Sequence, residues 1–208
     1  MSVAIHDLLD GLRDAWPDAT YELNWDTPEE MLVATILAAQ ATDERINKVT
    51  PGLFAKYPNP QAFADADLEE LEVDLKPTGF FRRKAKTVKA VCQALVDDFG
   101  GQAPRTMAEM VTLPGVARKT ANVVLNCCFD IPSGVIVDTH VQRVSQRMGL
   151  TTQRNAERIE ADLMQQIPEE DWTFFGPAAV LHGRYTCKNK KPACDTCPFD
   201  KACPKLGV

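Results

Sequence analysis

Four of the seven cysteines in this chain lie close together near its C-terminal end, and they constrain its fold most strongly. Their spacing is Cys187-x6-Cys194-x2-Cys197-x5-Cys203. Four thiolates joined by short loops can bind one metal centre. The loops between them are too short to form a second layer of structure. Because so short a segment cannot build a core of its own, it must fold back onto another part of the chain.

The composition is that of a folded soluble protein, with 45% hydrophobic and 25% charged residues among 208. No apolar run approaches the roughly 18 residues that predict a membrane span. The first residues lack the basic-then-apolar pattern of a signal peptide. These features predict a cytoplasmic protein with no membrane partner. In that compartment thiols stay reduced, which favours metal ligation over disulfides.

The charges along the chain are strongly segregated. The net charge of −6 argues mildly against nucleic acid as a partner, yet residues 76–89 contain six basic side chains and no acid. The preceding residues 65–74 contain six carboxylates, which we interpret as a solvated helix face. Because fields decay over about 8 Å at physiological salt, a local patch sets phosphate affinity more than the net charge does. On charge alone, a solvated face and a phosphate-binding surface explain the basic run equally well. Basic residues also outnumber acids around the four cysteines, which suggests a surface that meets phosphate.

The pattern of apolar and capping residues predicts an all-α protein. Thr27-Pro28-Glu29-Glu30 and Thr106-Met107-Ala108-Glu109 both carry helix-start signals. Pro and Gly fall between the helix-length segments, and no run of alternating strands is present. The predicted helices cover residues 4–16, 31–39, 67–75, 83–98, 106–113, 117–129, 139–148, 154–166 and 172–182.

Residues 113–121, with the sequence LPGVARKTA, lie between two of these predicted helices. Pro114-Gly115 allows a tight turn in which glycine can take a positive φ and let backbone approach a ligand. The N–H groups that open the second helix then face outward and can bind an anion. This layout is that of a helix–hairpin–helix, which binds a DNA phosphate through backbone amides.

Several segments resemble the endonuclease III family, whose members are bifunctional DNA glycosylases and abasic-site lyases. The matching segments are AQATD at 39–43, LPGVARKTANVVLN at 113–126, VDTH at 137–140, and LHGRYTC at 181–187 with the three later cysteines. They occur in the family's order over most of the chain. The hairpin lysine, the downstream VDTH and the cysteine spacing are specific in combination.

The resemblance implies a two-lobed helix–hairpin–helix DNA glycosylase fold and a [4Fe–4S] cluster. One lobe is a six-helix lobe of residues 22–132, with the helix–hairpin–helix at about 106–129. The other is an iron–sulfur cluster lobe of residues 1–21 and 133–208, with its cluster loop at 187–203. The four cysteines are the implied cluster ligands, and structural zinc is the minority alternative. Length and connectivity suggest a monomer.

The resemblance also implies a nucleophile at Lys119 and an essential carboxylate at Asp138. The lysine amine attacks C1′ of a damaged deoxynucleotide, expels the base and leaves a Schiff base, and β-elimination of the 3′ phosphate follows. The amine must be neutral, which burial or a neighbouring cation such as Arg118 favours. For Asp138 we favour a role in stabilising positive charge on the sugar over assisting lysine deprotonation. From the residues alone, Asp138 is a helix N-cap and Lys119 a phosphate contact.

The implied substrate is double-stranded DNA with an oxidised pyrimidine or an abasic site, bound in the cytoplasm at the bacterial nucleoid. Flipping a base out of the duplex leaves a gap, which Gln40 is expected to fill while Phe80 wedges the opposite strand. On sequence alone, Phe80 and Phe81 are as well explained as core residues. Ala117 stands where the family usually has a second hairpin glycine. The further DNA contacts implied are Lys84, Leu113, Gly115, Val116, Ala117, Thr120, His140, Arg143, Arg184, Lys190 and Lys191.

Three other functions compete with this interpretation. An adenine-mismatch glycosylase shares the implied fold and cluster loop, but such enzymes usually lack the hairpin lysine and carry a further C-terminal domain. A non-catalytic DNA-binding module and an iron–sulfur redox sensor could use the same scaffold. The presence of both Lys119 and Asp138 argues against these last two.

Overall fold

The protein is described here by a computed structural model that covers residues 2–208. Its regular elements in this range are all helical, without a strand, which confirms the predicted all-α class. No helix in the same range is long and apolar enough to cross a membrane. The chain divides into two compact units, Glu22–Phe129 and Met1–Tyr21 with Asp130–Val208.

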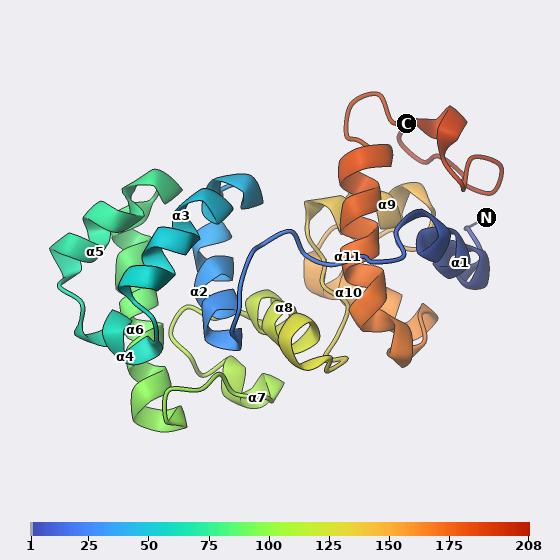
Figure 1. Ribbon diagram of the computed structural model, residues 1–208. Helices are drawn as coiled ribbons and strands as arrows, with labels where there is room; N and C mark the ends of the chain where they lie inside the picture. Colours follow the sequence, from blue (N-terminus) through green and yellow to red (C-terminus); the bar gives the residue numbers. More distant parts are fainter. Residues whose placement is uncertain (1) are drawn as a thin grey trace. The chain divides into compact units, whose positions relative to one another are not determined.

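The unit Glu22–Phe129 is built around α2, whose buried residues after its first turn, Met31, Leu32, Val33, Ala34, Ile36 and Leu37, face several sides of the helix. Such a helix has to be covered on each of these sides. It packs against α3, α6 and α8, while α6 packs against α4 and α5 (Figure 1). The helices are α2 (Pro28–Ala38), α3 (Asp43–Lys56), α4 (Pro60–Asp65), α5 (Leu68–Leu75), α6 (Phe81–Phe99), α7 (Met107–Met110) and α8 (Arg118–Phe129), with a short 3-10 helix at Lys76–Thr78.

Side-chain caps fix the starts of these helices where the sequence predicts them. The Thr27 hydroxyl accepts a hydrogen bond from the Glu30 N–H at 3.2 Å, with Pro28 in the first turn of α2. The Thr106 hydroxyl accepts from the Glu109 N–H and donates to its carboxylate at 2.6 Å. Each pair satisfies N–H groups that a helix start otherwise leaves open.

The sequence pattern predicts no helix in residues 40–66. The structure has α3 and α4 in this range. The proline in the middle of α3, Pro51, lacks an N–H and normally ends a helix. The buried stripe of α3 is also narrow and includes a polar residue, Thr50. The caps were the available signal, because Thr42 accepts from the Arg45 N–H and Asn59 caps α4.

The second unit has its own hydrophobic core, formed by α1, α9, α10, α11 and the chain that follows. Within this unit, α11 packs against α1 and α9. The chain continues from α11 into a π-helical turn that also packs against α9. The elements are α1 (Ile5–Ala15), α9 (Thr139–Arg147), α10 (Ala156–Gln166), α11 (Trp172–Leu181), the π-helical turn His182–Thr186, and short 3-10 helices at Glu169–Asp171 and Cys194–Thr196 (Figure 1).

The C-terminal cysteine segment folds back onto this core, as its length required. Phe199 is 3% exposed and belongs to the core cluster. Its ring lies against Gly11 of α1 so closely that a Cβ at that position would overlap it. The cysteine segment and α1 therefore meet at this buried aromatic ring.

Candidate functional site

The hairpin between α7 and α8 is held by a turn hydrogen bond and by two buried side chains. The Val116 N–H donates to the Leu113 carbonyl at 3.1 Å, and both side chains are buried. Gly115 is exposed at the tip with φ of 74°, and a Cβ there would lie 2.8 Å from Thr87 Cγ2. Glycine is therefore required at 115 both for its backbone conformation and for its lack of a side chain.

Ala117 is accommodated at the start of α8 without backbone strain. Its φ is not positive, its side chain is exposed, and its carbonyl accepts from the Ala121 N–H at 3.0 Å. The first turn of α8 thus begins normally despite the missing glycine. A helix leaves the N–H groups of this turn without intrahelical acceptors, so they suit an anion.

Lys119 lies in this first turn of α8 and its side chain is exposed. Arg118 precedes it in the chain and is exposed as well, so two cationic groups stand at the positive end of the helix dipole. Burial within the protein does not remove water from the Lys119 amine. Exclusion of water from this amine has to come from a bound molecule.

A cavity of about 310 Å³ lies beside the hairpin within the same unit. It brings together residues that are far apart in the sequence, from the end of α2, the start of α6 and the hairpin. The predicted residues among those that line it are Gln40, Phe80, Lys84, Gly115 and Thr120. Hydroxyl, amide, cationic and apolar groups therefore meet in one concave surface of the size that small-molecule or nucleotide groups occupy.

Two residues at this cavity have left-handed backbone conformations that are unusual for residues with a side chain. Gln40 follows α2 with φ of 56°, and Phe80 precedes α6 with φ of 47°. Phe80 is 66% exposed, whereas Phe81 is half-buried with Arg82 over its ring at 5.3 Å. Such conformations concentrate at functional sites, where the surrounding structure maintains them.

The basic run of residues 76–89 is only partly available to a ligand. Lys84 is 5% exposed, and its amine donates to the Thr78 carbonyl at 2.8 Å. Burial lowers the pKa of Lys84, as does the nearby charge of Arg45. The amine of Lys89 donates to the carbonyls of Ala64 and Ala66. The basic side chains that remain exposed are Lys76, Arg82, Arg83 and Lys86.

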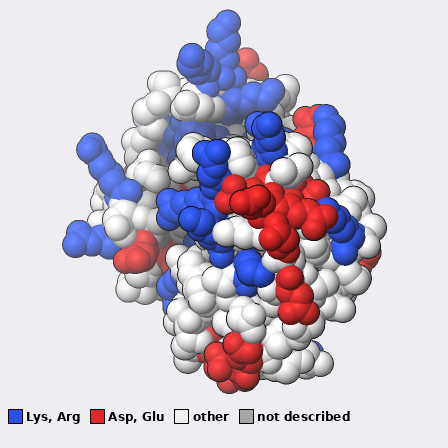
Figure 2. Space-filling model, turned by 90° about the vertical axis from the view of Figure 1, so that its left-hand side faces the viewer, with Lys and Arg blue, Asp and Glu red and all other residues white. Residues whose placement is uncertain are grey.

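The acidic run of residues 65–74 lies mostly on the exposed side of α5 and the loop before it. Figure 2 shows the face that carries α5, where carboxylates gather beside lysine and arginine side chains. Lys56 bonds Glu70 at 2.8 Å and Asp74 at 2.6 Å. Exposed pairs of this kind contribute little to stability. The acidic side of this unit would repel a phosphate backbone.

Asp138 is the N-cap of α9 in the second unit. One carboxylate oxygen accepts from the N–H groups of His140 at 2.7 Å and Val141 at 2.8 Å. The other oxygen lies 3.0 Å from His140 Nδ1, which donates to it when that nitrogen carries the proton. The carboxylate is about one-fifth exposed. The two backbone N–H groups and the helix dipole stabilise its negative charge.

Two arginines one turn apart on α9 bind the start of the cysteine segment. Arg143 donates to the carbonyls of Gly183 at 2.7 Å and Cys187 at 3.1 Å, and burial lowers its pKa. Arg147, which the sequence reasoning missed, donates to the carbonyls of Lys188 and Asn189 at 2.7 and 3.0 Å. Nothing in the sequence distinguishes Arg147 from a surface base at the end of a helix. Of the other basic residues predicted to bind DNA, Lys190 and Lys191 are exposed and Arg184 is half-buried.

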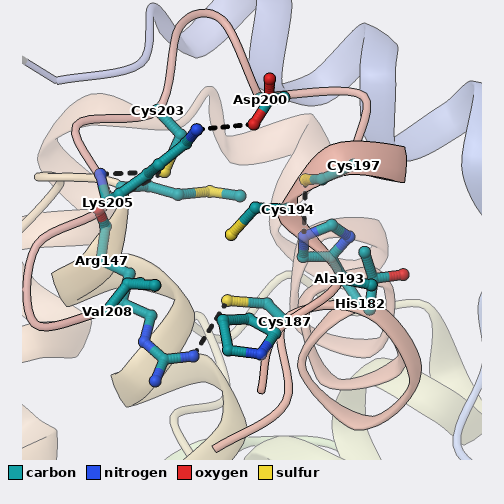
Figure 3. Close-up of a pocket in the computed structure, with 13 residues that line it drawn as sticks. Arg147, His182, Cys187, Ala193, Cys194, Cys197, Asp200, Cys203, Lys205 and Val208 are labelled. Carbon is teal, nitrogen blue, oxygen red and sulfur yellow. Dashed lines mark hydrogen bonds and ion pairs between the residues drawn. The ribbon is translucent and has the colours of Figure 1, made fainter. Parts of the chain in front are cut away.

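The four C-terminal cysteines line one pocket, and none of them is in a disulfide. Figure 3 shows the sulfurs of Cys187, Cys194, Cys197 and Cys203 turned toward the same interior space. The Arg147 guanidinium lies 3.5 Å from the Cys187 sulfur. Burial raises the pKa of the Cys197 and Cys203 thiols, and the neighbouring cysteines raise it further. Deprotonation of these thiols therefore needs a positive centre between them.

The thiol set is chemically suited to iron–sulfur ligation, since four cysteine thiolates are the usual ligands of a [4Fe–4S] cluster. Within the part of the chain that the structure describes, no group of three or more His, Cys, Asp or Glu side chains is arranged to hold a single metal ion. His182 also lines the pocket and is fully buried, with Nε2 at 3.7 Å from the Cys197 sulfur. Burial lowers the pKa of His182 to about 4, so its ring is neutral.

The remaining three cysteines lie in the other unit. Burial raises the pKa of the Cys92 and Cys128 thiols to about 12, and it raises that of Cys127 further. All three are therefore protonated at neutral pH and unreactive as nucleophiles. We interpret all three as small apolar residues.

An exposed hairpin with a lysine in the following helix, beside a cavity of mixed polarity, defines a nucleic-acid-processing protein of the helix–hairpin–helix class. Residues 33–169 match the family described as the HhH-GPD superfamily of base excision DNA repair proteins. The matched region contains Gln40, the hairpin with Lys119, and Asp138, and it ends before the four cysteines.

Individual relatives and solved structures match nearly the whole chain. Endonuclease III of Synechocystis sp. is 51% identical over 93% of this chain and 88% of its own length. Endonuclease III of Escherichia coli K12 is 38% identical over 95% and 93%. A solved structure of a trapped endonuclease III–DNA covalent intermediate is 41% identical, with a TM-score of 0.91 over 97% of this chain and 94% of that one. The chain belongs to the endonuclease III family and is a DNA glycosylase of base excision repair.

Proposed function

We propose that this protein is a bifunctional DNA glycosylase and abasic-site lyase that excises oxidised pyrimidines from double-stranded DNA. The observation that carries the proposal is the position of Lys119 in the first turn of α8, exposed directly after the hairpin. The hairpin amides bind a phosphate, and this brings the sugar of the same strand near the lysine. A trapped covalent intermediate of a relative with DNA supports a covalent step here.

Base excision from a duplex begins with extrusion of the damaged nucleotide, which costs a few kcal/mol. The cavity beside the hairpin carries the side chains that can offset this cost. Gln40 supplies amide groups that can replace those of the extruded base, and the exposed ring of Phe80 can stack in the opposite strand. Both act from conformations that are already formed before DNA binds.

The chemistry then proceeds on the extruded sugar. The lone pair of the Lys119 amine forms a bond to C1′, and the glycosidic bond breaks with its electron pair leaving on the base. Opening of the sugar ring gives a Schiff base between Lys119 and C1′. The positive charge of the Schiff base acidifies the hydrogen on C2′. Removal of this proton expels the 3′ phosphate by β-elimination. Water then hydrolyses the Schiff base and releases the lysine.

Asp138 is proposed to stabilise the positive charge that develops on the sugar as the base departs, and secondarily to help deprotonate Lys119. Its carboxylate is fixed by the His140 and Val141 N–H groups, so its charge needs no reorganisation when the transition state forms. Preorganised charge of this kind usually makes the largest electrostatic contribution to a rate.

The experiment that tests the function is borohydride trapping of the wild-type protein on a panel of duplexes. We expect a covalent adduct with abasic sites and with oxidised pyrimidines, and none with undamaged DNA. Strand cleavage on the 3′ side of the abasic site should accompany it. A protein that binds these duplexes but never forms an adduct would rule out the lyase. Adducts with abasic sites alone would rule out the pyrimidine specificity.

We further propose that Cys187, Cys194, Cys197 and Cys203 hold a [4Fe–4S] cluster, which supplies a structural centre and takes no part in the chemistry on the sugar. The cluster would balance the thiolate charges in the pocket and fix the lysine-rich loop at residues 188–191 for a DNA backbone. Purified protein is expected to contain about four irons per chain and to absorb in the visible range. Native protein that contains zinc and no iron would show that the four cysteines bind structural zinc instead.

The proposed partner is duplex DNA in the cytoplasm, bound by a single copy of the chain. A helix–hairpin–helix contact and one cavity are complete within one chain, so no second copy is needed to form the binding surface. Sedimentation of the protein with a short lesion duplex should give a one-to-one complex, whereas a two-to-one complex at micromolar concentration would contradict the monomer.

A further inference from the structure

The loop between the 3-10 helix and α6 holds its conformation against local preference. Gly79 has φ of 72°, and Phe80 follows with φ of 47° and ψ of 29°, a left-handed conformation. This conformation is unfavourable for any residue with a Cβ. The Phe80 ring is 66% exposed, so its burial does not compensate. Another part of the structure must hold the loop in place.

Lys84 binds this loop on both sides of Gly79 and Phe80. Its amine donates to the Thr78 carbonyl at 2.8 Å, in a hydrogen bond whose atoms are buried. Its backbone N–H donates to the Phe80 carbonyl at 3.1 Å. Thr78 is itself fixed, because it is 1% exposed and its hydroxyl donates to the Leu75 carbonyl at 2.8 Å. The two bonds from Lys84 therefore bracket the two left-handed residues.

A buried ammonium is costly unless it replaces its hydration with specific bonds. Lys84 occupies such a position although its neighbours Arg83 and Lys86 in the same helix are exposed. A lysine that only contacted a DNA phosphate would serve better from the surface, where it could move to the backbone. The placement of Lys84 thus favours action on the protein loop over direct action on DNA.

We propose that Lys84 is a positioning residue, which holds Phe80 ready to enter the DNA stack, and not a phosphate contact. The proposal rests on the proposed function, because it assumes that the protein extrudes a base while Phe80 fills the opposite strand. It replaces the direct DNA contact that the sequence predicts for Lys84. The two roles differ in what they do to the salt dependence of binding and to the base-opening step.

The test compares Lys84→Met with Lys86→Met, which removes the same charge from an exposed side chain of α6. Base opening is followed by the fluorescence of 2-aminopurine next to the lesion. We expect Lys84→Met to slow opening between about fivefold and thirtyfold, the range that loss of the one charge-assisted hydrogen bond from the amine to Thr78 produces, since the backbone N–H bond to Phe80 is retained. The slope of log K against log salt should stay at the wild-type value, since each lost phosphate contact changes it by about 0.9.

A double-mutant cycle with Phe80→Ala decides whether Lys84 acts through the ring. Lys84→Met should have no further effect on base opening when the ring is already absent. A salt slope that falls by about 0.9 in Lys84→Met, or an undiminished effect in the Phe80→Ala background, would overturn the proposal. Lys84→Arg keeps the charge and provides a second variant should the methionine variant unfold. A phosphate contact predicts wild-type opening for the arginine variant, and a positioning role predicts slow opening.

Failure of this inference is separable from failure of the proposed function. Cleavage of an abasic site in single-stranded DNA needs no wedge, so Lys84→Met should cleave it at the wild-type rate. If the wild-type protein neither opens the base nor forms a Schiff base, the proposed function fails. If the wild-type protein does both and Lys84→Met opens the base equally fast, only the role of Lys84 is wrong.

Discussion

Replacing Lys119 with glutamine is expected to abolish the borohydride-trapped adduct and to lower base excision by about 10³-fold or more. The variant lacks the amine that forms the bond to C1′, so both the glycosylase step and the elimination lose their covalent path. Losses of this order are usual when a nucleophile is removed. Because Lys119 is exposed in the first turn of α8 and glutamine is a good helix former, the fold should be unaffected. Adduct formation in a single turnover on an abasic duplex measures the effect.

The matched control is Arg118→Gln, which removes the neighbouring exposed cation and leaves the amine in place. We expect this variant to form the adduct, at a reduced rate if the adjacent charge helps to keep the amine neutral. Duplex binding should change by only a few-fold in either variant, since the hairpin amides are unaltered. If Lys119→Gln still gave the wild-type adduct, the nucleophile would have to be another residue.

The sequence predicted helices well where caps and apolar periodicity agreed, and it failed where they conflicted. Thr27 and Thr106 located the starts of α2 and α7. Residues 43–56 carry both a Thr42 cap and a proline at 51, and α3 was missed. In the structure, packing against α2 and the 3-10 helix keeps α3 continuous past its proline. Tertiary contacts therefore decided a conflict that local propensity could not resolve.

The candidate site was predictable in its residues and not in its arrangement. Motif resemblance identified Gln40, Phe80 and Gly115 separately, and only the fold brings them to one cavity. Charge counting treated the six bases of residues 76–89 alike, whereas the amines of Lys84 and Lys89 are bound to backbone carbonyls of the protein itself. A sequence reports which charges exist, whereas their exposure depends on how the helices pack. This is why a predicted DNA contact became a candidate for positioning a loop.

Replacing Asp138 with asparagine should separate its role as a helix cap from its role as a charge. Asparagine is as good an N-cap as aspartate. Its side-chain oxygen can still accept from the His140 and Val141 N–H groups, which lie 2.7 and 2.8 Å from the present carboxylate. The variant should therefore fold with wild-type stability while losing the negative charge. We expect its single-turnover excision rate to fall by about 10²–10³-fold, the usual cost of removing one preorganised electrostatic group.

The companion variant Asp138→Ala removes the cap as well, and urea unfolding should show a further loss of about 1 kcal/mol. If Asp138 only caps α9, the two variants differ in excision rate. Asparagine then retains full excision, and alanine loses activity in proportion to its instability. If the charge matters, both variants are equally slow once each is measured fully folded. The carboxylate is already fixed by two backbone N–H groups before DNA binds, so its charge is available without rearrangement. Because this charge is proposed to act only as the base departs, we expect the asparagine variant to bind a lesion duplex normally and to accumulate uncleaved complex.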